Sequence, residues 1–181
     1  MIEWIMITVL AVVAGYAIWV YNRLVASRNQ VAESWAGIDV QLQKRHELVP
    51  NLVATVKGYV DHESGALEKV TRLRSIAASD VSERAASESS LSRSIGRLFA
   101  LAEAYPDLKA SEGFQQLHES LVDIEDHLQY ARRYYNGSVR DNNNLVESFP
   151  ANLVAGVFGF HSRRFFEIEL ASQRELPDVA L

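Results

Sequence analysis

The chain has 181 residues, a formal net charge of −5 and no cysteine. The lack of cysteine excludes a disulfide framework, a thiol nucleophile and a cysteine-ligated metal. The acidic balance argues against a general nucleic-acid binder, which needs a basic face. Because 48% of the residues are hydrophobic and Gly and Pro are few, the composition fits one helical domain plus a separate apolar segment.

The first segment, residues 2–21, reads IEWIMITVLAVVAGYAIWVY and predicts a membrane anchor. Its one charge is Glu3, and a helix of about 20 residues rises about 30 Å, the thickness of the hydrocarbon core of a bilayer. Aromatic rings lie near both ends, where the interface favours them. The positions that define the span and its ends are Ile2, Trp4, Ala11, Gly15, Trp19 and Tyr21.

A cleaved signal peptide is the competing interpretation of this segment. It would need a basic region at the N-terminus, which is absent, and a good cleavage site, which Val25-Ala26-Ser27 is not. A retained anchor is therefore preferred. Ala11 and Gly15 have the spacing with which small residues let two membrane helices pack, so a homo-oligomer is an open alternative.

The flanks of the span predict its orientation. No Lys or Arg precedes Arg23, whereas Arg23 and Arg28 follow the span closely. The positive-inside rule then places the N-terminus outside and the rest of the chain in the cytoplasm.

Beyond the span, apolar side chains recur every three or four residues, which is the spacing of one helix face. The positions are Val31, Trp35, Ile38, Leu42, Val49, Leu52, Val56 and Tyr59. They predict a helix that leaves the membrane without a break and runs towards Ala78. Within it, HELVPNLVATVKGY contains Pro50, which has no N–H and crowds the carbonyl of His46. Because the three-four spacing continues on both sides of Pro50, we expect the helix to bend there rather than end. The alternative is that the helix breaks, at Pro50, at Gly58 or at Ser64-Gly65.

The middle of the chain predicts a linker and two further helices. Residues 78–94, ASDVSERAASESSLSRS, are serine-rich, and because their early part lacks an apolar face they are predicted to contain a linker, with Leu91 already on the apolar face of the following helix. A helix follows to about Ala104, and Tyr105-Pro106-Asp107 predicts a turn. The next helix is predicted from the N-cap Ser111 to Asn144. The residues that hold its three-four spacing are Phe114, Leu117, Leu121, Ile124, Leu128, Ala131, Tyr135, Ser138 and Asn142.

Together these elements predict an all-α fold: an N-terminal transmembrane helix that continues into an antiparallel bundle of three to four long helices. The predicted domains are the anchor at 1–22, the helical bundle at 23–166 and a flexible tail at 167–181.

The segment Phe149–Glu169, FPANLVAGVFGFHSRRFFEIE, differs from the helices before it because it is apolar and aromatic. It either caps the bundle or touches the membrane with its rings immersed and its arginines at the phosphates. The cap is preferred, since the run lacks a long amphipathic period. Its candidate residues are Phe158, Phe160, Arg163, Arg164, Phe165 and Phe166.

Three stretches resemble the LemA family of bacterial membrane proteins: YNRLVASRNQVAESWAGIDVQLQKRHELVPNLVATVKGYVDHE, LFALAEAYPDLKASEGFQQLHESL and ARRYYNGSVRDNNNLVESFPANLVAGVFGF. They occur in the family's order and cover most of the chain. Positions that match the family pattern are Arg45, Pro50, Asn51, Leu52, Val53, Tyr135, Asn136, Val139 and Arg140. Asn142, where the family has an aromatic residue, and Ser64-Gly65 depart from it.

The resemblance implies a single-pass protein of the bacterial inner membrane with a cytoplasmic helical bundle and no established biochemical activity. Family members often accompany membrane zinc metalloproteases in gene order, and a relative takes part in forming a bacterial membrane organelle. The resemblance thus implies an accessory or organising role, with other membrane proteins, including a metalloprotease, as candidate partners.

The motifs of catalysis are missing from the sequence. A di-iron bundle needs Glu-x-x-His pairs, and none of the five histidines has a glutamate three residues before it. Asp123 and His127 lie one helical turn apart, but a solvated pair is preferred over a metal pair. No nucleophile elbow, phosphate-binding loop or dinucleotide fingerprint occurs. We therefore predict no enzyme, no catalytic residue, no metal and no cofactor.

Five positions within the family-like motifs, Arg45, Pro50, Asn51, Asn136 and Arg140, are candidates for a structural or a binding role. A buried polar network that fixes helix register is preferred, and a partner-docking patch is the alternative. The predicted function is a membrane-anchored helical scaffold or adaptor for other membrane proteins, in contact with the lipid bilayer and not with nucleic acid. A membrane-organising protein whose aromatic C-terminal segment contacts lipid is the alternative, and a metal-binding or enzymatic bundle is less favoured.

Overall fold

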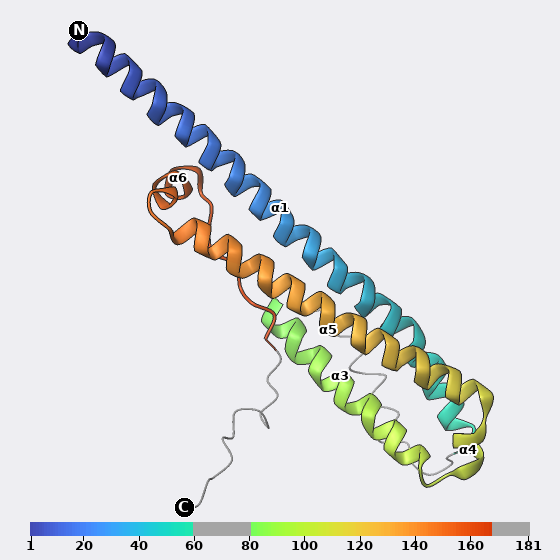
Figure 1. Cartoon of the computed structure of the whole chain (residues 1–181). Coiled ribbons are helices and arrows are strands. Elements are labelled where there is room, and N and C mark those ends of the chain that lie inside the picture. Colours follow the sequence, from blue (N-terminus) through green and yellow to red (C-terminus); the bar gives the residue numbers. More distant parts are fainter. Residues whose placement is uncertain (60–80, 168–181) are drawn as a thin grey trace, which may run out of the picture. The chain divides into compact units, whose positions relative to one another are not determined.

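The computed structural model describes residues 1–59 and 81–167, and the regular structure in these residues is entirely α-helical. The helices, labelled in Figure 1, are α1 (Ile2–Lys57), α3 (Val81–Ala102), α4 (Pro106–Ala110), α5 (Glu112–Glu147) and α6 (Ala151–Phe158). They confirm the predicted all-α fold with a long apolar helix at the N-terminus. The predicted tail at 167–181 lies outside the described residues apart from Glu167.

The described chain forms two compact units. The first unit combines Met1–Asp39 with Tyr130–Phe165, and the second unit contains Val40–Gln129, to which Phe166 is also assigned. Both α1 and α5 contribute residues to each unit.

Helix α1 passes through Pro50 without interruption, so the proline does not split it. A proline removes one backbone hydrogen bond, and buried neighbours on both sides, Val49 and Leu52, hold the helix in place. The helix ends at Lys57 rather than near Ala78, so the predicted length was wrong. Its end is the predicted break point Gly58, where the N–H groups of Gly58 and Tyr59 still bond to carbonyls of the last turn, at 3.3 and 3.0 Å. Ser64-Gly65 lies outside the described residues.

In the first unit, α6 and the end of α5 pack against α1, as Figure 1 shows. The apolar cluster between them consists of Val20, Leu24, Ala151, Ala155 and Phe160. Further along the same helices, Trp35 meets Tyr135 edge-on, with 5.2 Å between ring centroids. The face that the sequence predicts for α1 is buried from Val31 to Val56, with Trp35 partly exposed, whereas Tyr59, beyond the end of the helix, is 45% exposed.

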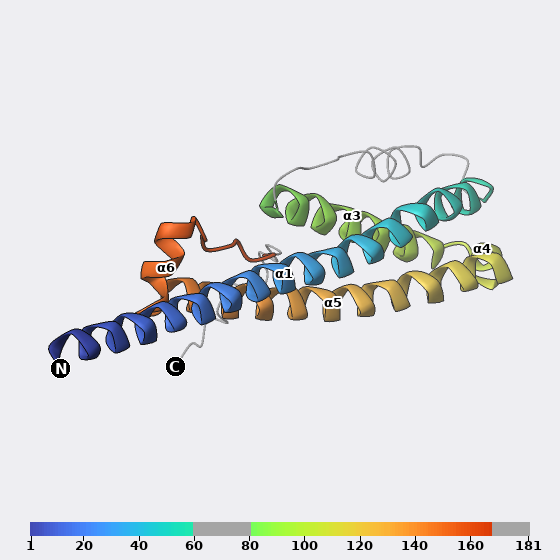
Figure 2. The same ribbon diagram turned by 90° about the horizontal axis from the view of Figure 1, so that it is seen from above.

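In the second unit, the last turns of α1 pack with α3, α4 and the start of α5, which lie together in Figure 2. The apolar core there is formed by Val49, Leu52, Val56, Leu91, Ile95, Leu98, Ala102, Leu108, Phe114 and Leu121. The side chains that the four helices supply to this core are at most 5% exposed, as expected for the apolar faces of packed helices.

The linker that the sequence predicts in the early part of 78–94 was wrong from Val81 on, because α3 begins there; residues 78–80 lie outside the described residues. This part of α3 buries small and polar side chains, among them Ala85, Glu88 and Ser94. Its serines bond to their own helix: the Ser94 hydroxyl donates to the Ser90 carbonyl at 2.9 Å. Such bonds satisfy a hydroxyl that is buried. Because the buried face of this part of α3 consists of small and polar side chains, the spacing of apolar residues does not predict it.

In the connection between α3 and α5, helices begin at residues that the sequence singles out: α4 at Pro106, and α5 just after Ser111. Tyr105 has a non-helical backbone before Pro106, which occupies the first turn of the short α4. The Ser111 hydroxyl accepts the Phe114 N–H at 3.4 Å, which confirms the predicted N-cap. Helix α5 continues three residues past the predicted end at Asn144.

Candidate functional site

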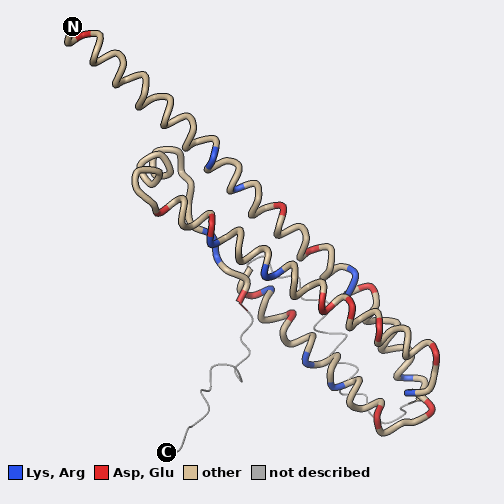
Figure 3. Tube along the Cα trace, in the orientation of Figure 1, with Lys and Arg blue, Asp and Glu red and all other residues tan. Residues whose placement is uncertain are grey.

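The first turns of α1 present apolar side chains to the outside on all faces. An 18-residue window of this helix has a mean hydropathy of 2.0, and only 6% of it is buried. Trp4 and Trp19, near the two ends of the span, are 75% and 54% exposed. The first basic residue of the chain is Arg23, and Figure 3 shows a long uncharged stretch after the acidic position at the start of α1. A surface of this kind is unfavourable in water and suits the hydrocarbon core of a membrane.

The small residues of the span, Ala11 and Gly15, are exposed as well. A Cβ added to Gly15 would meet nothing within 4 Å. Helix pairing through these residues therefore stays a prediction.

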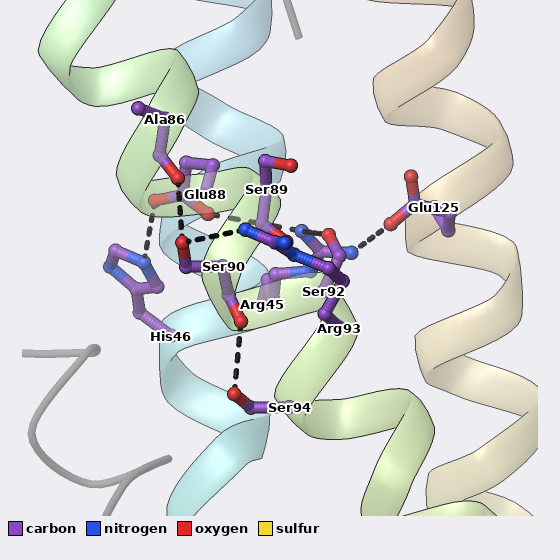
Figure 4. Close-up of polar contacts among 10 residues, drawn as sticks. All are labelled: Arg45, His46, Ala86, Glu88, Ser89, Ser90, Ser92, Arg93, Ser94 and Glu125. Carbon is purple, nitrogen blue, oxygen red and sulfur yellow. Dashed lines mark hydrogen bonds and ion pairs between the residues drawn. The ribbon is translucent and has the colours of Figure 1, made fainter. Parts of the chain in front are cut away.

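A buried arginine joins three helices of the second unit (Figure 4). Arg45 on α1 is 3% exposed, and its guanidinium lies 3.8 Å from a carboxylate oxygen of Glu88 on α3. The same guanidinium donates to the Ser92 hydroxyl at 2.9 Å and to the carboxylate of Glu125 on α5. The second oxygen of Glu88 lies 2.9 Å from Nε2 of His46. We call these five residues the Arg45 cluster.

The Arg45 cluster connects α1, α3 and α5. Two carboxylates offset the buried positive charge, and the helices are fixed in the one register that brings them together. The interpretation of Arg45 as part of a buried polar network thus agrees with its contacts.

The other candidate positions have different surroundings. Pro50 is half-buried, and the Asn51 side chain is exposed. Asn136 and Arg140 lie on α5 within the first unit, where Arg140 is exposed and pairs with Asp141 at 3.7 Å. The structural and docking roles of these four positions stay predictions.

The sequence interpretation missed the acidic partners of Arg45. Glu88 occupies the same three-four row of α3 as Leu91, Ile95 and Leu98. Arg45 also interrupts an apolar helix face, and the sequence interpretation singled it out for that reason. The same pattern at Glu88 could have identified it as a buried partner.

After α6, residues 159–165 form a segment that we call the strap. It begins at Gly159, whose φ of 70° is left-handed and ends the helix in a conformation that glycine adopts without strain. The Asn143 side chain then binds both backbone groups of Arg163, donating to its carbonyl at 2.9 Å and accepting its N–H at 2.7 Å. The Tyr135 hydroxyl donates to the Arg164 carbonyl at 3.0 Å. Side chains of α5 thus hold the strap through its backbone.

The predicted cap or lipid segment is divided between a buried and an exposed part. Phe160 and Phe166 are buried, and Phe160 packs into the cluster with Val20 and Leu24. Phe158 and Phe165 are exposed, and so are Arg163 and Arg164. Phe160 thus packs within the first unit, whereas Phe166 belongs to the second. The cap role of the segment and a membrane role for its exposed part stay predictions.

The Tyr135 phenol makes the strap sensitive to alkaline pH. Burial raises the pKa of Tyr135, and the nearby Arg163 charge opposes part of that rise. The folded unit then holds the phenol proton more tightly than the unfolded chain does, so the protonated phenol contributes to the free energy of unfolding. This contribution is fully present below about pH 10, the tyrosine pKa in the unfolded chain. It is lost as the pH rises through the raised pKa of the folded unit.

We therefore expect Tyr135→Phe to cost about 1 kcal/mol at neutral pH through the lost hydrogen bond, and to weaken the alkaline loss of stability. Thermal melts at neutral and alkaline pH measure both effects. Tyr130→Phe, at an exposed tyrosine, is the matched control, and an alkaline transition that is identical in Tyr135→Phe and the parent chain would contradict the assignment.

The histidine and carboxylate side chains of the described residues do not gather as a metal site would. No group of three His, Cys, Asp or Glu side chains gathers there. Asp123 and His127 do approach to 3.7 Å, but both are exposed, as a solvated pair would be. A hollow of about 510 Å³ in the second unit is lined mainly by Phe99, Phe114 and His118, with a Lys109–Glu103 ion pair at 3.3 Å.

Comparisons with known proteins agree on one family. The profile of the LemA family matches residues 34–181. The Protein LemA of Metamycoplasma hominis is 27% identical over 161 residues, which is 87% of this chain and 72% of the relative. The magnetosome protein MamQ 2 of Paramagnetospirillum magneticum is 25% identical over 191 residues, covering 89% of this chain and 70% of the relative. A shorter match to the magnetosome protein MamQ of Magnetospirillum gryphiswaldense is 31% identical over 72 residues, or 40% of this chain and 26% of that protein.

Proposed function

Since the chain belongs to the LemA family, we propose that it is a membrane-anchored helical scaffold or adaptor that organises or assists other membrane proteins. The span is retained in the bacterial inner membrane, with the N-terminus outside and the helical units in the cytoplasm, because the basic residues follow the span. The role is not catalytic, and the protein acts by holding partners at the membrane.

The continuity of α1 is the observation that carries this proposal. One helix of 56 residues includes both the apolar span and residues of the packed units, with no flexible segment between them. A protein bound to either unit would therefore be tethered through ordered structure rather than through a loose linker. Two relatives are named magnetosome proteins, which supports a role in organising membranes or their proteins.

An exposed aromatic pair on α5 offers a surface for such a partner. Tyr130 and Tyr134 are 65% and 58% exposed and lie one helical turn apart. The Arg133 guanidinium carbon lies 4.6 Å from the Tyr130 ring centroid, and Gln30 donates to the Tyr134 hydroxyl. Tyrosine and arginine are the residue types that dominate binding energy at protein interfaces. Another membrane protein, of which a membrane metalloprotease is one candidate, is the partner that this proposal assigns.

Photo-cross-linking in native membranes tests the adaptor role. With benzoylphenylalanine in place of Tyr134, we expect an adduct with another membrane protein or with a second copy of the chain. The same probe at Glu119, which is also exposed on α5, is the control and should give no such adduct. The proposal fails if Tyr134 yields no adduct, or the same adducts as Glu119.

A further inference from the structure

Helix α6 and the residue before it leave apolar side chains largely exposed. Phe149, just before the helix, is 80% exposed, and Leu153, Val157 and Phe158 are 61%, 80% and 59% exposed. Leu153 and Val157 lie one turn apart, so they share a side of the helix. Contiguous apolar surface of this kind usually marks a contact with a protein or a membrane.

The place where α6 docks indicates which contact this is. Ala151 and Ala155 pack against Val20 and Leu24 of α1, where the apolar span gives way to the first basic residue. The Tyr21 ring, at the end of the span, meets the Phe158 ring at 4.8 Å. When the span lies in a bilayer, α6 is therefore held at the depth of the lipid–water interface.

The charges around α6 suit the same position. The helix itself carries no charge. Within the first unit, Arg28 lies over the Phe160 ring at 5.4 Å, and Arg23 lies over the Trp19 ring at 5.3 Å. Arginines beside an apolar helix at the end of a span can reach the phosphates of lipid headgroups while their stems stay on the rings.

We propose that α6 is an interfacial helix whose Phe149, Leu153, Val157 and Phe158 side chains are immersed at the acyl boundary of the bilayer that holds the anchor, with Arg23 and Arg28 at the lipid phosphates. This inference rests on the anchor of the proposed function, and it adds a second contact of the first unit with lipid. A single span can rotate about its axis, and immersion of α6 fixes which side of the first unit faces the membrane.

Spin labels test this placement in the full chain, which contains no cysteine and therefore accepts a single one at any position. Val157→Cys carries the nitroxide on the apolar side of α6. Asn152→Cys carries it on the other exposed side of the same helix, and Val122→Cys carries it at an exposed apolar position of α5. Val9→Cys reports the span. The labelled chains are reconstituted in vesicles of equimolar phosphatidylglycerol and phosphatidylcholine.

The measured quantity is the accessibility of each nitroxide to oxygen, which partitions into lipid, and to a water-soluble nickel chelate. We expect the ratio of oxygen to nickel accessibility at Val157→Cys to be severalfold higher than at Asn152→Cys and Val122→Cys, and to approach that at Val9→Cys. High accessibility to both reagents at residue 157 would place it in water and overturn the proposal. Low accessibility to both would mean that protein covers it, which also overturns the proposal. Loss of the lipid signal at Val9→Cys would instead contradict the anchor itself.

Discussion

Replacing Arg45 by alanine is expected to lower the free energy of unfolding by about 3–5 kcal/mol, which is typical when one partner of a buried ion pair is removed. Glu88 is 4% exposed, so its charge would lose its guanidinium partner while remaining away from water. The partial exposure of the Glu125 side chain, 31%, lets water replace the lost contact there. His46 stays beside the other oxygen of Glu88, so the penalty comes mainly from the loss of the guanidinium next to this buried carboxylate.

This origin of the penalty can be tested with a double variant. In Arg45→Met/Glu88→Leu both charges are absent and apolar side chains fill the space, so most of the loss should be recovered. Thermal or denaturant unfolding followed by circular dichroism compares the single and double variants, and non-additivity reports the coupling. An Arg45→Ala chain that unfolds like the parent would show that the Arg45 cluster does not hold the three helices.

Truncating Leu52 to alanine is the second change with a large expected effect, about 2–5 kcal/mol. Leu52 is fully buried in the core of the second unit, two residues after Pro50. Loss of its side chain leaves a cavity that the surrounding helices can fill only partly. Leu52→Met, which keeps the volume, should cost less than about 1.5 kcal/mol. Equal melting of Leu52→Ala and Leu52→Met would contradict the core assignment.

The neighbouring Asn51 separates stability from binding. Its side chain is exposed, so Asn51→Ala should change stability by no more than about 0.5 kcal/mol. Unfolding measurements and recovery of cross-linked complexes on the same variant then distinguish two roles. Reduced recovery without reduced stability indicates docking, whereas a large loss of stability would contradict the exposed placement.

Local signals in the sequence predicted the features that depend on neighbouring residues. The apolar run before Arg23, the continuation of the helix through Pro50 and the N-cap at Ser111 are all local, and the structure agrees with each. The three-four spacing also predicted the buried face of α5, including Leu121 and Leu128.

The features that the sequence did not predict depend on contacts between distant residues. The start of α3 at Val81 is one, because Glu88 can be buried only when Arg45, 43 positions earlier in the chain, lies beside it. The end of α5, which lies beyond the predicted Asn144, is a second such feature. Asn143, near this end, binds the strap 20 residues further along the chain. A hydrophobic pattern does not encode polar pairings of this kind.

The central claim is that the opening apolar segment spans the membrane and keeps the helical units on the cytoplasmic side. Labelling of a single cysteine in Glu103→Cys, whose side chain is 70% exposed beside α4, by a membrane-impermeant maleimide tests it most directly. We expect the membrane-bound chain to react in inside-out vesicles of bacterial membrane and to be protected in right-side-out vesicles. Reaction in right-side-out vesicles, or recovery of the chain outside the vesicles, would contradict this account.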